Sequence, residues 1–125
     1  MLGVKRIIYL LAFFLIFCPQ KLNAVGDWTT PDEMEEFYSD ESTKLFVYVY
    51  LSGLVTGLIF GNDDLCIPDN IAYSDDIVFK GEEYYSIYRN EYVREVDFYQ
   101  GLFEEYGFIP PIIVLNRGIQ YEYPC

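Results

Sequence analysis

The chain has 125 residues, of which 20 are acidic and eight basic, and it contains no histidine. Its formal net charge of −12 argues against binding to nucleic acid or anionic lipid and favours a basic macromolecular partner. Hydrophobic residues make up 52% of the chain and aromatic residues 19%, so a packed core is expected rather than disorder.

The first residues have the pattern of an export signal. Lys5 and Arg6 give a basic start, and the apolar run at 7–17 is too short for a comfortable membrane span. Ala24 supplies a small residue at the expected cleavage point. We therefore predict a signal peptide over residues 1–24 and a periplasmic location, with an uncleaved N-terminal anchor as the alternative.

Cleavage at that point would leave residues 25–125, the length of one domain. It would remove Lys5, Arg6 and Lys21, three of the eight bases, and none of the 20 acids. The remaining chain would carry 20 acids against five bases, a formal charge of −15. No internal repeat, low-complexity tract or linker divides it, so a single domain is expected.

Helices are predicted from capping residues and from apolar residues that recur every three or four positions. Thr30 can cap a first helix that ends near Asp40, with Pro31 in its first turn and Glu33 at the capping-box position. A second helix is expected from about residue 42 to residue 60.

Later helices follow the same logic. Asp76 and the two residues before it can cap a helix at 77–88, and further helices are expected near 91–106 and 112–121. The IIVL run at 112–115 has no second strand of similar quality to pair with. The fold class is therefore predicted as all-α, a compact bundle of four to five helices.

The run from Leu45 to Phe60 allows two interpretations. Its 16 residues are marginal for a membrane span, and Gly53, Gly57 and Gly61 have the spacing that lets helices approach closely in membranes or in cores. We favour a central helix buried on nearly all sides, with its glycines at close helix crossings and no stable membrane span.

Two cysteines, Cys66 and Cys125, remain once the signal peptide and its Cys18 are removed. In an exported chain they most simply form one disulfide, which would close a loop of about 60 residues. An intermolecular bridge or two free thiols is the alternative.

The sequence offers few groups for catalysis. Without histidine the commonest general base and metal ligand is missing, and the serines lack a nucleophile motif. The acid pairs at 35–36, 82–83 and 104–105 diverge around a helix and suit a solvated face, and the acidic turns at 62–64 and 69–70 lack calcium-loop spacing. We therefore expect no enzyme activity, no metal and no cofactor.

Tyrosine is the unusual enrichment, with 13 residues in the chain. The members that crowd the second half beside the acids are Tyr84, Tyr85, Tyr88, Tyr92, Tyr99 and Tyr106. Such rings either pack between helices or offer rigid contact area to a partner. The predicted partner-binding residues, which combine both residue types, are Tyr85, Tyr88, Tyr92, Glu95, Tyr99 and Glu104.

Three motifs together resemble a known family. YLSGLVTG at 50–57, LCIPDN at 65–70 and the terminal YPC at 123–125 are similar to the periplasmic immunity proteins of type VI secretion amidase systems, the Rap/Tai group. The resemblance implies a small all-helical fold, a Cys66–Cys125 disulfide and frequent homodimers. It also implies one role, to bind and block a peptidoglycan-cleaving amidase.

The leading hypothesis is accordingly a periplasmic immunity protein that sterically inhibits a basic-surfaced amidase. The alternative is a periplasmic acid-stress holdase, which would lose negative charge and expose apolar surface as its carboxylates protonate. An acid-dependent hydrolase that uses Glu82 or Glu104 is a third class.

Overall fold

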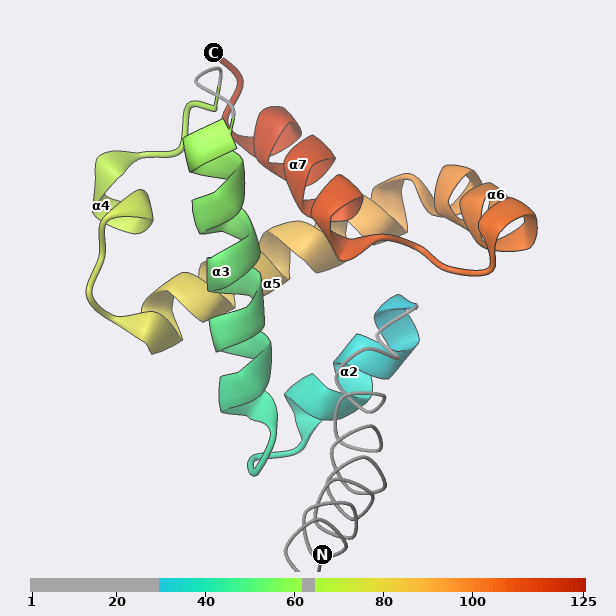
Figure 1. Ribbon diagram of the computed structural model, residues 1–125, viewed down its shortest axis with the longest axis horizontal. Coiled ribbons are helices and arrows are strands. Elements are labelled where there is room, and N and C mark those ends of the chain that lie inside the picture. The colour runs from blue at the N-terminus through green and yellow to red at the C-terminus, as the bar shows by residue number, and fades with distance from the viewer. Residues whose placement is uncertain (1–29, 62–64) are drawn as a thin grey trace, which may run out of the picture.

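The computed structural model describes residues 30–61 and 65–125, so the predicted signal peptide lies outside the described residues. The described part contains six helices and no strand, which confirms the all-α class (Figure 1). The helices are α2 (Pro31–Ser39), α3 (Lys44–Gly61), α4 (Asp69–Ala72), α5 (Ile77–Arg94), α6 (Val96–Tyr106) and α7 (Pro111–Glu122).

Thr30 and Asp76, the predicted N-terminal caps, act as the sequence indicates. The Thr30 hydroxyl accepts a hydrogen bond from the Glu33 amide at 3.4 Å, and the Asp76 carboxylate accepts from two amides at the start of α5, both at 3.1 Å. Gly107 ends α6 in the left-handed region with φ of 79°, which a residue without a Cβ adopts without strain.

The helices differ from the prediction in two places, at the end of α5 and at α4. The expected break before residue 91 is absent, because the buried side of α5 continues from Tyr84 through Tyr88 to Glu91 and the helix ends only at Arg94. The one-turn helix α4 was missed. It follows Pro68, whose carbonyl accepts hydrogen bonds from the Ile71 and Ala72 amides at 3.0 Å.

The core lies where α3, α5 and α7 meet. In Figure 1, α3 crosses in front of α5, α7 packs on α5 beside the second half of α3, and α2 packs against the start of α3. Burial of each large apolar side chain stabilises the fold by about 1.5–3 kcal/mol. The fully buried residues include Met34, Val47, Leu51, Val55, Tyr84, Tyr88, Tyr99, Val114, Leu115 and Ile119.

The close helix crossings use different glycines from those predicted. A Cβ on Gly81 of α5 would overlap the Tyr48 side chain of α3, and one on Gly118 of α7 would lie 2.8 Å from Cγ2 of Ile87. By contrast, apart from the neighbouring turns of α3 itself, no atom of residues 30–61 and 65–125 lies within 4 Å of the Cβ position of Gly53 or Gly57. The expectation that the α3 glycines pack inside the fold is therefore wrong.

Helix α3 is also not buried on all sides. Val47, Leu51 and Val55 face the core, whereas Phe46 and Phe60 on the opposite side are 61% and 85% exposed. Among the described helices, α3 is long and apolar enough to cross a membrane by length and composition. The helices that pack against α3, which are α2, α5 and α7, cover only its inner side.

The predicted disulfide joins Cys66 and Cys125, whose Cα atoms are 5.5 Å apart. It ties the segment after α3 to the end of α7, so the C-terminus lies beside the end of α3 (Figure 1). The last residue of the chain is thereby fixed to the middle of the sequence.

Candidate functional site

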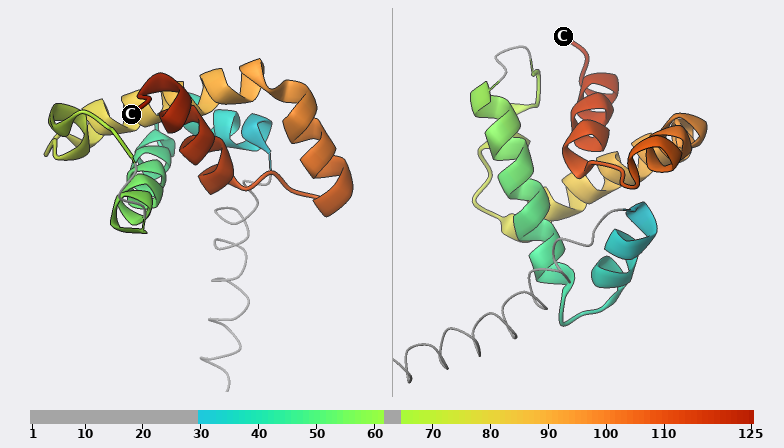
Figure 2. Two further views of the ribbon diagram at one scale, coloured as in Figure 1. Left: turned by 90° about the horizontal axis from the view of Figure 1, so that it is seen from above. Right: turned by 45° about the vertical axis from the view of Figure 1, so that its right-hand side comes forward.

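Helix α6 extends away from the crossing of α3, α5 and α7. Figures 1 and 2 show it at one end of the molecule, joined to the rest by the end of α5 and by the segment that leads into α7. Only Tyr99 of α6 is fully buried, and Leu102 packs partly against the core. The helix is therefore held near its start and exposed along most of its length.

Tyr99 anchors α6. Its hydroxyl donates a hydrogen bond to Oε1 of the buried Glu91 at 3.0 Å, and its ring lies 6.0 Å from that of Tyr92 and 5.1 Å from that of Phe98. Burial raises the pKa of Tyr99 well above its usual value, and the hydrogen bond to Glu91 raises it further. The phenol stays protonated and remains a donor at neutral pH.

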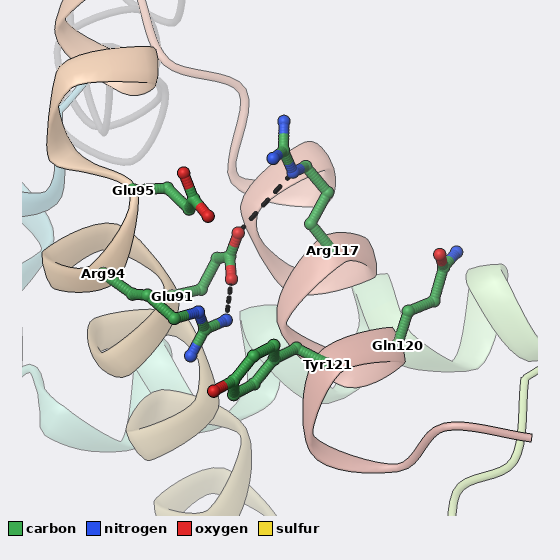
Figure 3. A pocket seen from close by; sticks show the side chains of 6 residues that line it. All are labelled: Glu91, Arg94, Glu95, Arg117, Gln120 and Tyr121. Carbon is green, nitrogen blue, oxygen red and sulfur yellow. Dashed lines mark hydrogen bonds and ion pairs between the residues drawn. The ribbon is translucent and has the colours of Figure 1, made fainter.

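Glu91 binds two arginines as well as Tyr99. Its Oε2 accepts from Arg94 one turn later on α5, and its Oε1 lies 3.6 Å from Nε of Arg117 on α7 (Figure 3). Arg94 stacks over the Tyr121 ring at 3.3 Å. The carboxylate thus links α5, α6 and α7, and its negative charge is compensated at the point where α6 begins.

A shallow hollow of about 170 Å³ opens beside this cluster, between α5 and α7. Glu91, Glu95, Arg94 and Arg117 line it together with Gln120 and Tyr121 (Figure 3). The two acids balance the two bases, and both oxygens of Glu91 already have partners. The geometry suits a structural clamp, because Arg94, Arg117 and Tyr99 occupy both oxygens of the buried Glu91.

The exposed residues at the end of α6 and in the segment after it combine rings and acids. Phe103, Tyr106 and Phe108 are 43%, 62% and 46% exposed, and Glu104 and Glu105 are exposed between them. We call these five residues the arm surface. Helix α6 contains no basic residue. The arm surface therefore combines apolar rings with uncompensated negative charge.

The structure divides the predicted partner-binding residues into two groups. Tyr85, Tyr88 and Tyr99 are 7%, 0% and 0% exposed, so the expectation that their rings face a partner is wrong for this fold. Tyr85 stacks on the Tyr38 ring at 3.7 Å, and burial raises its pKa to about 12. Tyr85 and Tyr88 point inward because they lie on the side of α5 that α3 and α7 cover, with Tyr38 of α2 stacked on Tyr85. Tyr99 points inward from α6 toward Glu91.

The other predicted residues lie at or near the surface. Glu104 is exposed on α6, and Tyr92 and Glu95 are half-buried near its start. Glu91, Arg94 and Arg117 were missed by the sequence interpretation. Glu91 could have been found, because this acid follows Tyr84 and Tyr88 at helical spacing on the buried side of α5.

A second carboxylate cluster joins α2, α3 and α5. Glu82 accepts hydrogen bonds from Tyr48 and from Tyr38 at 2.6 Å, and Nζ of Lys44 lies 3.6 Å away. Burial acts to raise the pKa of Glu82, but the two phenols and Lys44 outweigh it and hold that pKa below its usual value. The hydrogen bond to Glu82 raises the pKa of Tyr38 to about 12.

Neither cluster has the composition of a metal centre. Among residues 30–61 and 65–125, no group of three or more cysteine, aspartate or glutamate side chains is placed to hold an ion. The two acids considered singly for a hydrolase lie apart, since Glu82 faces the tyrosines of α2 and α3 while Glu104 lies on α6.

No protein-family model, curated protein or solved structure matches the chain. The likeness to amidase immunity proteins therefore remains a resemblance of motifs. What the molecule does is inferred from those motifs and from its surface.

Proposed function

We propose that this protein is a periplasmic immunity protein, which binds a type VI secretion peptidoglycan amidase and blocks it sterically. The observation that carries the proposal is the disulfide between Cys66 and Cys125, because it joins the LCIP and YPC motifs within an all-α fold. A disulfide also suits the oxidising periplasm. The resemblance implies this combination of motifs, fold and bridge.

We assign the amidase contact to the arm surface. Its exposed rings at Phe103, Tyr106 and Phe108 supply rigid contact area, and aromatic residues commonly contribute most of the binding energy at interfaces. Glu104 and Glu105 beside them suit a basic partner, which the net charge of the chain would also attract. Tyr99 and Glu91 hold the helix that carries these residues.

The test uses an amidase with a Cys–His pair encoded beside this gene. The exported protein and the amidase should co-purify, and the protein should stop the amidase from cleaving peptidoglycan. Tyr106→Ala combined with Phe103→Ala should weaken binding at least tenfold, since both rings lie on the arm surface.

Tyr73→Ala is the matched control. Tyr73 is 72% exposed, comparable with Tyr106, but it lies at the end of α4. It should leave both binding and inhibition unchanged. If the wild-type protein gives no protection of peptidoglycan against that amidase, the immunity function is wrong. If both variants bind equally well, the arm surface is not the contact.

Acid-stress holdase activity is the second candidate, and one observation favours it. The outer side of α3 already exposes apolar rings such as Phe46 and Phe60, which a partly unfolded client could bind. Suppression of aggregation of unrelated proteins at low pH, without binding to the amidase at neutral pH, would select the holdase over the immunity protein.

A further inference from the structure

The break between α5 and α6 has no cause in the local sequence. Only Glu95, with φ of −118° and ψ of 38°, separates the two helices, and Figure 2 shows α6 turning away from the direction of α5. Sharp bends in helices usually occur at proline or glycine, and neither occurs from Glu82 to Gln100. Contacts between side chains therefore hold the bend.

The backbone around Glu95 stays close to a helix. The Glu95 amide donates a hydrogen bond to the Glu91 carbonyl at 3.0 Å, and the Tyr99 amide donates one to the Glu95 carbonyl at 3.1 Å. Both bonds join residues four positions apart, as in an uninterrupted helix. Gly107, with φ of 79°, ends α6 on the other side. Single residues at the ends of helices commonly act as hinges, and α6 has one at each end.

Two contacts hold α6 in its bent position. The Tyr99 hydroxyl donates a hydrogen bond to Oε1 of Glu91 at 3.0 Å, and the Arg117 guanidinium of α7 lies 4.1 Å from the centre of the Phe98 ring. In a straight helix, residues eight positions apart lie about 12 Å apart along the axis and about 80° apart around it. The contact between Glu91 and Tyr99 therefore exists only in the bent arrangement. We call these two contacts the α6 latch.

Little else fixes α6 to the fold. One of its 11 residues, Tyr99, is fully buried, whereas α7 buries four of its 12 residues. Segments with few buried contacts open at a lower free energy than the core of the same protein. We propose that α6 undocks as a unit about Glu95 and Gly107 while α3, α5 and α7 stay packed, and that the α6 latch closes it.

Most of the arm surface moves with this helix. Phe103, Glu104, Glu105 and Tyr106 all lie on α6, so undocking displaces them together. The strength of the α6 latch therefore sets the fraction of molecules that present these residues in the docked position. The latch and the arm surface share no residue, so a substitution in the latch changes the position of that surface without changing its composition.

Hydrogen exchange of the exported, disulfide-bonded protein tests this inference. Amides of α6 should exchange at least about tenfold faster than those in the buried part of α7. Low concentrations of urea should leave α6 exchange unchanged and speed exchange in α7, because a local opening exposes little new surface and global unfolding exposes much. Equal exchange in the two helices, or equal acceleration by urea, would show that α6 opens only when the whole protein unfolds, and would overturn the proposal.

Substitutions in the α6 latch test which contacts close it. Phe98→Ala should speed α6 exchange about two- to fivefold, the factor that corresponds to one exposed contact between a cation and a ring. Alanine is the better helix former, so a weaker helix cannot explain faster exchange. Arg117→Gln should have at least the same effect, because it also removes the ion pair to Glu91 and leaves the sequence of α6 intact.

Phe103→Ala is the matched control. Phe103 is 43% exposed and Phe98 is 42% exposed on the same helix, but Phe103 is not part of the latch, so its removal should not speed α6 exchange. If α6 exchanges no faster in Phe98→Ala and Arg117→Gln than in Phe103→Ala, the α6 latch is wrongly assigned. None of these results depends on binding of the amidase.

Discussion

The buried Glu91 connects three helices, α5, α6 and α7. It is 2% exposed, and its partners are Tyr99 on α6, Arg94 on α5 and Arg117 on α7. Burial of a carboxylate is unfavourable unless such partners compensate it. Here they do so at the base of α6, so Glu91 helps to hold the arm surface in position.

Glu91→Gln tests that dependence. Glutamine keeps an acceptor for the Tyr99 hydroxyl but loses the attraction to both arginines, so the free energy of unfolding should fall by about 1–3 kcal/mol. Urea denaturation measures the change. Glu104→Gln, on the exposed side of α6, should change it by no more than about 0.5 kcal/mol. Equal effects of the two substitutions would contradict the assigned role of Glu91.

Glu82 makes stability depend on acid pH. Its pKa in the folded state is below the ordinary value of 4.5, so its contribution to stability is present above about pH 4.5 and is lost as the pH falls through the lowered pKa. Denaturation at stepped pH should therefore show a shallower acid loss in Glu82→Gln than in wild type. Tyr38→Phe, which removes one donor to Glu82, should reduce the loss partly. An unchanged slope in both variants would show that the cluster does not couple to pH.

At the scale of the helices, Gly81 and Gly118 set how closely α5 packs against α3 and α7. Gly118→Ala should destabilise the fold by about 1–3 kcal/mol, because its Cβ would lie 2.8 Å from Cγ2 and 3.1 Å from the backbone oxygen of Ile87. Gly57→Ala is the control and should stabilise the fold by about 0.5–1 kcal/mol, since alanine is the better helix former and the space is open. Thermal unfolding of both variants at one pH measures the difference. If Gly57→Ala destabilised the fold and Gly118→Ala did not, the tight crossing would lie on α3 and not on α7.

These helices could be predicted from the sequence wherever a local signal specifies them. Thr30, Asp76 and Gly107 act through hydrogen bonds or backbone angles within a few residues, so their roles follow from neighbouring positions. The role of a glycine at a crossing depends on which helix lies opposite it. The spacing of Gly53 and Gly57 could not show that they face outward, nor could the isolated Gly81 show that it meets Tyr48.

The candidate site could be predicted only in part for the same reason. The acids and rings after residue 84 did indicate a region of interest, and Glu104 lies on the exposed arm. Whether a tyrosine of α5 faces the core or a partner depends on how α2, α3 and α7 cover that helix. Tyr85 and Tyr88 thus belong to the core, whereas Tyr106, two turns beyond the anchor Tyr99, is exposed.

For the whole molecule, repulsion between negative charges opposes folding, and the Cys66–Cys125 disulfide stabilises the folded state against that repulsion. Twenty acids in a small domain repel one another, which lowers the stability of any folded state. The Cys66–Cys125 bridge restricts the unfolded chain across a separation of 59 residues. It also fixes α7 beside the end of α3, and α7 provides the Arg117 that binds Glu91.

Removal of the bridge should therefore affect the entire fold. Cys66→Ala and Cys125→Ala should each lower the free energy of unfolding by roughly 4 kcal/mol, because either one releases the same closed loop. The double variant should add little to either single one, since no bridge is left to lose. Thermal and urea unfolding of the three variants measure this, with reduced wild-type protein as the control. Single variants that differ widely from each other would show that the two cysteines do not stabilise the molecule through one intramolecular bond.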